Sequence, residues 1–158
     1  MVMNIARFLF LALMFGTIDV QPSKAAMDCV SETPLPSDLA MTSPTSDVPQ
    51  ANARYVGVWV GAWQDQGRDA LCHRLVISSV DADGAVEGIY SSGTYAGWNI
   101  SRSDYYNIQG RIFDGKLVLA QFPSGSQARY WFSGNDLQGL YETSRGQTSD
   151  IVLRRQVE

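Results

Sequence analysis

The chain has 158 residues, of which 45% are hydrophobic and 18% are charged, and its formal net charge is −4. This length suits one ordinary domain. The acidic balance argues against a nucleic-acid partner, because no cluster of Lys and Arg is present to neutralise phosphates.

Residues 1–25 have the pattern of a secretory signal peptide. Arg7 precedes an apolar run, Phe8–Ile18, and Ser23 and Ala25 supply the small side chains found before a cleavage site. The run is too short to span a bilayer, which needs roughly 20 apolar residues. We therefore expect a secreted or periplasmic protein with no membrane span in the mature chain.

Residues 26–53 form an acidic segment that is rich in Pro, Ser and Thr and has no Lys, Arg or aromatic residue. Such a composition buries too little apolar surface to offset the entropy lost on ordering. It predicts a disordered, extended tail or linker. The folded domain is expected over 54–158, where all later aromatic residues lie.

Turn signals divide the folded domain about every ten residues. Examples are Gln64–Asp69, Asp81–Gly84 and Pro123–Ser126, and a longer break covers Ser91–Ser103. The segments between turns have no helical period and are rich in strand-forming residues. The predicted strands are 55–63, 71–80, 85–90, 105–113, 116–122, 127–133, 137–144 and 148–154. Their succession predicts an all-β fold, a single antiparallel up-and-down barrel of about eight strands, since closure removes exposed edges.

The first predicted strand contains two Gly-x-Trp triplets, in the stretch GVWVGAW. Strand alternation places Tyr55, Gly57, Trp59, Gly61 and Trp63 on one face. Glycine permits the sharp coiling of a strand at a barrel corner, and a neighbouring ring covers the gap it leaves. Packing is therefore the main interpretation, and room for a ligand beside inward glycines is the second.

Several residues of the first three predicted strands match a known pattern: Gly57, Trp59, Asp81–Gly84, Gly88, Tyr90 and Ser92. This pattern resembles the opening of avidin-like and, more loosely, lipocalin-like barrels of the calycin type. In avidin-like proteins the matching tyrosine and serine hold the ureido group of biotin, so the resemblance implies that Tyr90 and Ser92 face a ligand. Residues 55–155 are also similar to secreted bacterial barrel modules of unknown function.

Cys29 and Cys72 are the two cysteines. In an exported protein a disulfide between them is expected, pinning the acidic segment to the second strand. Two unpaired thiols are the alternative, because Cys29 lies so near the cleavage site. His73 follows Cys72 directly, but adjacent strand residues point to opposite faces, so no Cys–His dyad is expected. A single histidine also leaves a zinc site short of ligands, and we expect no metal and no cofactor.

The carboxylates Glu87, Glu142 and Asp150 are the candidates for acid–base chemistry, and their spacing in the sequence does not decide whether any two of them meet. No nucleophile elbow or phosphate-binding loop is present. We therefore expect a protein that is not an enzyme and has no catalytic residues.

The expected function is binding of a small, partly apolar ligand in the lumen or mouth of the barrel. The candidate ligand-binding residues are Trp59, Tyr90, Ser92, Trp98 and Trp131. Trp98 lies in the longest predicted loop and forms either a lid or an apolar cap.

The alternative function is that of a packed structural or interaction barrel that acts through its outer surface. Its partner would be an envelope protein or a polysaccharide, or a protease that it inhibits. Contact would be made by three tyrosines expected to be exposed, Tyr105, Tyr106 and Tyr130.

Overall fold

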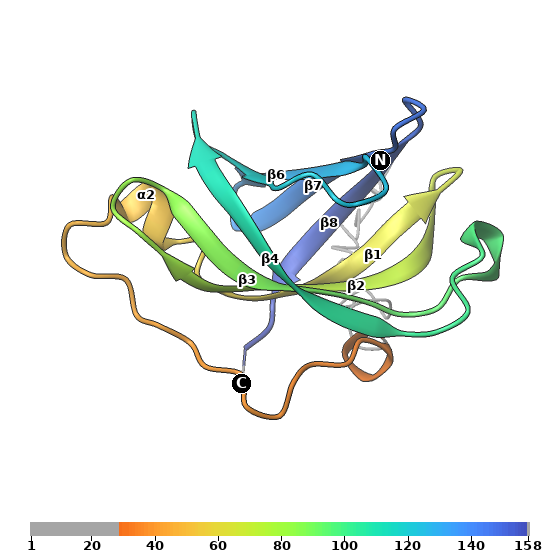
Figure 1. The fold of residues 1–158 in the computed structure, drawn as a ribbon, viewed down its shortest axis with the longest axis horizontal. Coiled ribbons are helices and arrows are strands. Elements are labelled where there is room, and N and C mark those ends of the chain that lie inside the picture. The colour runs from red at the N-terminus through yellow and green to blue at the C-terminus, as the bar shows by residue number, and fades with distance from the viewer. Residues whose placement is uncertain (1–28, 158) are drawn as a thin grey trace, which may run out of the picture.

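A computed structural model of the chain describes residues 29–157 and confirms the eight-stranded antiparallel barrel. Each strand pairs with the next one, and β8 pairs with β1, which closes the barrel (Figure 1). The strands are β1 (Gly57–Asp65), β2 (Arg68–Val80), β3 (Ala85–Ser92), β4 (Asp104–Phe113), β5 (Lys116–Leu119), β6 (Gln127–Ser133), β7 (Asp136–Glu142) and β8 (Thr148–Arg155). The predicted signal peptide lies outside the described residues.

Most strand boundaries lie within two residues of the sequence-based prediction, and the larger differences are at the β1–β2 turn and at the end of β5. The first two strands extend to a tight turn at Gln66 and Gly67, whose φ angles of 51° and 75° suit the left-handed turns that match strand twist. Strand β5 ends at Leu119, before the predicted end at residue 122, because the chain leaves the sheet ahead of Pro123.

The glycines of the Gly-x-aromatic pattern lie where neighbouring strands approach closely. A Cβ atom on Gly61 would lie 2.3 Å from the carbonyl oxygen of Val152, and one on Gly139 would lie 2.6 Å from the ring of Tyr130. Trp59 and Trp63 are each only 1% exposed and belong to the barrel core. The interpretation of the triplets as barrel packing is therefore confirmed.

One end of the barrel is closed by the short helix α2 (Gln50–Ala53) and the residues that follow it. Tyr55 donates its hydroxyl hydrogen to the Gly115 carbonyl at 2.9 Å, and Arg54 donates to the Gly134 carbonyl at 2.8 Å. The guanidinium of Arg155 lies 4.2 Å from the centre of the Trp59 ring. These contacts tie the helix to the β4–β5 and β6–β7 turns, so this end is filled with side chains.

Residues 29–49, here called the strap, run along the outside of the barrel to α2 (Figure 1). The expected disulfide joins Cys29 to Cys72, with the Cα atoms 5.0 Å apart. Further along, Ser91 donates to the Pro34 carbonyl at 2.6 Å, and the Thr42 amide donates to the Ser78 carbonyl at 2.8 Å.

The strap corrects the expectation of a disordered tail for this part of the chain. Its order comes from the covalent tether and from hydrogen bonds of its backbone, which the composition of the segment does not reveal. The strap also covers apolar side chains on the outer face of the sheet, where Val60 is 3% and Val76 0% exposed. No helix among residues 29–157 has the length and hydropathy needed to cross a membrane.

Replacing both cysteines, Cys29→Ser with Cys72→Ser, is expected to lower the free energy of unfolding by about 3 kcal/mol, because the disulfide restricts the unfolded chain. The two residues are separated by 43 positions, so the closed loop is long. Urea unfolding of the mature chain, with and without a reductant, measures this difference. The reductant should shift the midpoint of the native protein and leave the double variant unchanged. Equal midpoints for all samples would contradict a stabilising disulfide.

Candidate ligand site at the open end of the barrel

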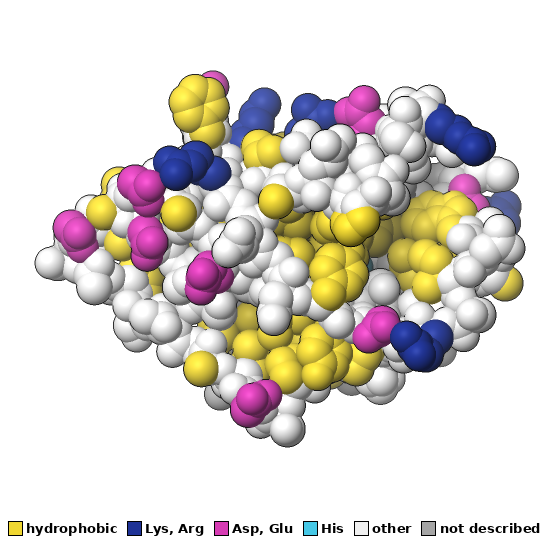
Figure 2. Space-filling view, in the orientation of Figure 1, with side chains coloured by type: hydrophobic (Ala, Val, Ile, Leu, Met, Phe, Trp, Pro, Cys, Tyr) yellow, Lys and Arg dark blue, Asp and Glu magenta, His cyan; other side chains and the backbone are white. Residues whose placement is uncertain are grey.

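The open end of the barrel lies opposite α2, where the β1–β2, β3–β4, β5–β6 and β7–β8 connections meet. Here β4 extends beyond β5: its pairing with β5 begins at Gly110, so residues 104–109 have no β5 strand beside them. Hydrophobic side chains gather in a hollow that begins above β4 and continues toward the open end (Figure 2). We call this hollow the mouth.

Three aromatic side chains from separate parts of the sheet surround the mouth. The Tyr106 and Phe122 rings are 5.9 Å apart, and the Phe122 and Tyr141 rings are also 5.9 Å apart. Tyr106 is 43% exposed, and the other two are half-buried. These rings offer planar apolar surface to a molecule that enters from solvent.

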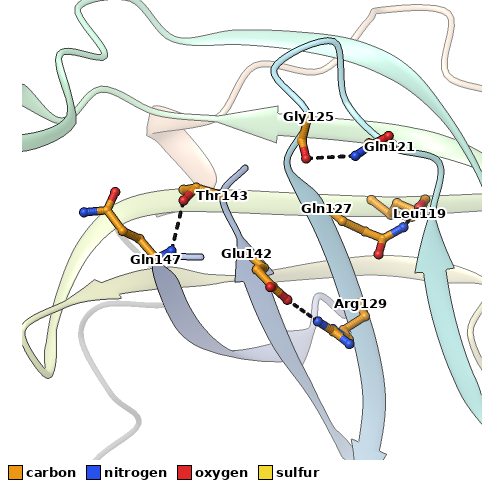
Figure 3. Close-up of polar contacts among 8 residues, drawn as sticks. All are labelled: Leu119, Gln121, Gly125, Gln127, Arg129, Glu142, Thr143 and Gln147. Carbon is orange, nitrogen blue, oxygen red and sulfur yellow. Dashed lines mark hydrogen bonds and ion pairs between the residues drawn. The ribbon is translucent and has the colours of Figure 1, made fainter. Parts of the chain in front are cut away.

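The turns that carry these rings are held by local hydrogen bonds (Figure 3). Gln121 donates to the Gly125 carbonyl at 2.9 Å, which fixes the loop bearing Phe122. In the β7–β8 turn the Gln147 amide donates to the Thr143 hydroxyl at 3.1 Å. These hydrogen bonds between side chains and backbone preorganise the rim.

The floor of the mouth consists of four buried aromatic and imidazole side chains: Trp63, His73, Tyr90 and Tyr130. The exposed fractions are 1% for Trp63, 0% for His73 and Tyr130, and 6% for Tyr90. The rings of His73 and Tyr90 are 4.1 Å apart, and the Tyr90 ring stacks on Tyr106 at 5.2 Å. The floor and the rim are thus one continuous stack of rings.

The hydrogen bonds of His73 determine its tautomer. Its Nδ1 lies 2.8 Å from the Ser91 carbonyl oxygen, which can only accept, so Nδ1 carries the hydrogen. Its Nε2 lies 3.1 Å from the Tyr130 hydroxyl, which therefore donates to it. Burial lowers the pKa of His73 from 6.5 to about 3, so the imidazole is neutral at physiological pH.

Three tyrosine hydroxyls at the mouth have a hydrogen that no acceptor among residues 29–157 receives. The Tyr90 hydroxyl oxygen accepts a hydrogen bond from the Trp63 indole nitrogen at 2.9 Å. No residue from 29 to 157 accepts the hydrogen of this hydroxyl. The hydroxyls of Tyr106 and Tyr141 likewise have no protein partner within the described chain. Burial, together with the neighbouring tyrosines, raises the pKa of Tyr90 and of Tyr106, so both hydroxyls stay protonated.

The β3–β4 connection lies beside the mouth and contains the short helix η1 (Ala96–Trp98). Tyr95 donates its hydroxyl hydrogen to Asp65 at 2.8 Å, and its ring contacts Trp98 edge-on at 5.4 Å. Trp98 is half-buried and packs against the barrel core. This contact fits the interpretation of Trp98 as an apolar cap. Movement of the loop as a lid stays a prediction.

Besides Trp98, the structure places the other four predicted ligand-binding residues in three locations. Tyr90 is in the floor of the mouth, and Ser92 follows it on the same face of β3. Trp59 lies in the filled closed end, where its indole donates to the Tyr55 carbonyl. Trp131 is a correction: Tyr130 points into the barrel, so strand alternation turns Trp131 to the outer face.

Of the three tyrosines that were predicted to lie at the surface, Tyr130 is buried, so this part of the prediction is wrong. It is 0% exposed because it lies opposite Gly139, which makes room for its ring inside the barrel. Tyr105 and Tyr106 are exposed, by 40% and 43%, as predicted. Their side chains lie on opposite faces of β4, so they do not form one patch.

The three candidate carboxylates do not line the barrel interior. Glu87, Glu142 and Asp150 alternate with inward residues and therefore lie on the outer face. Glu142 forms an ion pair with Arg129 (Figure 3). Within the described part of the chain, no three His, Cys, Asp or Glu side chains are arranged to hold a metal ion.

The sequence analysis missed most of the residues of the mouth. It did not single out Phe122 or Tyr141, and it considered His73 only as a member of a dyad or a metal site. Alternation along the first strand placed Trp63 on the face of Trp59, but the position of Tyr106 beside Tyr90 follows only from the register of β3 with β4.

Comparisons with known proteins support the fold. No protein-family model and no curated protein matches the chain. A de novo designed fluorescence-activating β-barrel is 12% identical, with a TM-score of 0.50 over 69% of this chain and 100% of the design. Two mutants of the fluorescent protein UnaG are 15% and 14% identical, with TM-scores of 0.44 and 0.43 over 66% of this chain and 98% of theirs. At such identities the likeness concerns the barrel architecture alone.

Proposed function

We propose that the protein is an exported barrel that binds a small, uncharged, partly apolar ligand in its mouth. The observation that carries this proposal is the group of three rim rings, Tyr106, Phe122 and Tyr141, together with hydroxyl hydrogens that no acceptor in residues 29–157 receives. These hydrogens belong to Tyr90 in the floor and to Tyr106 and Tyr141 in the rim. Planar parts of the ligand stack among the rings, and its oxygen or nitrogen acceptors receive the hydroxyl hydrogens.

The absence of charge in the ligand follows from the groups that face it. The mouth residues named above are aromatic or neutral, and His73 is held uncharged by burial. A charged ligand entering this site would lose its hydration without gaining an opposite charge, which is costly. Binding deeper than the floor is blocked by the filled closed end.

Export and a binding role, as opposed to catalysis, belong to the same proposal. The disulfide fits an oxidising compartment, and the apolar segment before it fits a signal peptide. The outward carboxylates and the neutral histidine leave the mouth without an ionisable group poised for acid–base chemistry. The avidin-like pattern at Tyr90 and Ser92 fits a ligand whose hydrogen-bond acceptor atom lies in the mouth.

Native mass spectrometry of residues 26–158, purified gently from the host, is expected to show an added mass that is lost on denaturation. Tyr106→Ala should weaken retention of this mass about tenfold, because a stacking ring is removed. Tyr141→Phe keeps the ring and should weaken retention about threefold to tenfold, through loss of one hydrogen bond.

Tyr105→Ala is the matched control, because Tyr105 is the next residue of the same strand and points outward. It should retain the mass like the native protein. Two results would count against a ligand in the mouth. One is an equal loss of the added mass in the Tyr105 and Tyr106 variants, and the other is the absence of an added mass from the native protein and all variants.

A further inference from the structure

A second concave site lies outside the barrel, between the strap and the outer face of β2, β3 and β4. Its volume is about 640 Å³, within the range of small-molecule sites. Figure 2 shows hydrophobic side chains gathered below β4, next to the N-terminal segment. We call this site the strap groove.

The strap groove is held open by two anchors of the strap. The Pro34 carbonyl accepts from Ser91, and the Thr42 amide donates to the Ser78 carbonyl, as described above. Residues 36–40 lie between these anchors and form one wall. The groove therefore exists only while the strap is in place, and the disulfide secures the strap at its start.

The walls of the groove combine apolar surface with negative charge. Pro36, Leu39, Ile89 and the exposed ring of Tyr105 supply the apolar contacts. Asp38 and Glu87 supply two carboxylates, and no Lys, Arg or His from the described part of the chain lines the groove.

Neither carboxylate is neutralised by the protein. Within residues 29–157, neither Asp38 nor Glu87 forms an ion pair, whereas Asp83, Asp104 and Glu142 each pair with an arginine. The groove thus carries uncompensated negative charge next to an exposed aromatic ring. An organic cation complements both features, by Coulomb attraction and by a cation–π contact.

We propose that the strap groove binds a small organic cation with an apolar body, such as an alkylammonium ion. The ammonium group lies between Asp38 and Glu87 and against the Tyr105 ring. The apolar body packs along Ile89, Leu39 and Pro36. This site and the mouth are on opposite faces of the sheet, so the two sites take ligands of different charge.

The test uses decyltrimethylammonium as the probe, below its micelle concentration, with decyl sulfate as the anionic comparison of equal chain length. Amide chemical shifts of the mature chain are recorded by NMR during each titration. The cation should shift the amides of Ile89 and Asn107 at saturable concentrations, at least tenfold lower than decyl sulfate requires. Added NaCl should weaken the binding, because the carboxylates are near the surface.

The variants separate the contribution of the carboxylates from that of the Tyr105 ring. Asp38→Asn with Glu87→Gln should raise the Kd about fivefold to tenfold, and Tyr105→Ala should raise it about as much. Asp150→Asn removes an exposed carboxylate from β8 and should leave the Kd unchanged. Tyr106→Ala should also leave it unchanged, in contrast to its effect on the mouth.

Several results would overturn the proposal. These are equal binding of the cation and the anion, shifts confined to Phe122 and Tyr141, no shift at Ile89 and Asn107, or an unchanged Kd in the double carboxylate variant. The proposed function in the mouth is independent of these outcomes, since it is tested by Tyr106 and Tyr141.

Discussion

Acidification from pH 7.5 to pH 4.5 is expected to lower the free energy of unfolding by about 3 kcal/mol through His73 alone, and by about 4 kcal/mol at pH 3. In the folded protein the pKa of His73 is lowered from 6.5 to about 3 by burial. Between these two values the unfolded chain binds a proton that the folded chain does not. Stability is therefore complete above pH 6.5 and falls as the pH drops toward 3.

Urea unfolding at pH 7.5, 6.0 and 4.5 measures this effect. The pKa of Asp83 is lowered, chiefly by the Ala85 amide, and the pKa of Asp104 by the Tyr105 amide, so their contributions are lost near or below pH 4 and do not confuse the comparison.

Two variants separate the histidine from other titrating groups. His73→Leu should show little change in unfolding free energy between pH 7.5 and pH 4.5, because the titrating group is gone. Tyr130→Phe keeps the histidine and should retain the pH dependence, although it removes the hydrogen bond to Nε2. A native protein whose stability is flat over this range would contradict the buried neutral imidazole.

Gly88→Ala is expected to destabilise the barrel by at least about 4 kcal/mol, or to prevent folding. A Cβ atom at this position would lie 2.0 Å from the carbonyl oxygen of Val76, which belongs to the backbone of the neighbouring strand. A backbone carbonyl in the middle of a sheet cannot rotate away as a flexible side chain can. The pairing of β2 with β3 would therefore be disrupted.

The same substitution at Gly67 provides the comparison. Gly67 has a φ of 75°, and a Cβ atom there would meet no other atom within 4 Å. Gly67→Ala should therefore cost only about 1 kcal/mol, from the left-handed backbone conformation. Circular dichroism during thermal unfolding measures both variants. Similar melting temperatures would show that the close approach at Gly88 does not limit the fold.

The strands and their succession could be predicted because they depend on local chemistry. Turn residues such as those of Asp81–Gly84 and Pro123–Ser126 mark where strands end, and the aromatic and β-branched residues between them form extended chain. The disulfide could be predicted because only Cys29 and Cys72 were available for it. The order of hairpins then favoured a closed barrel, since eight short strands would otherwise leave two open edges.

Which side chains of β6 point into the barrel could not be predicted from the sequence. Tyr130, Trp131 and Phe132 are consecutive aromatic residues. A large ring would therefore point into the barrel whether the even-numbered or the odd-numbered residues of β6 faced inward. The register with β7 decides between them, because Gly139 opposite Tyr130 leaves the space that the buried ring occupies. This pairing is a tertiary contact between strands.

The sequence by itself determined the number of strands, the closed antiparallel architecture and the covalent link. Local turn residues mark the strands, an open sheet of eight strands would leave two exposed edges, and only one pair of cysteines exists. Only the tertiary structure decided that the strap lies on the sheet and that Tyr106, Phe122 and Tyr141 meet above His73. These arrangements depend on strand register and barrel closure, which bring together side chains far apart in sequence and leave no periodic trace in it.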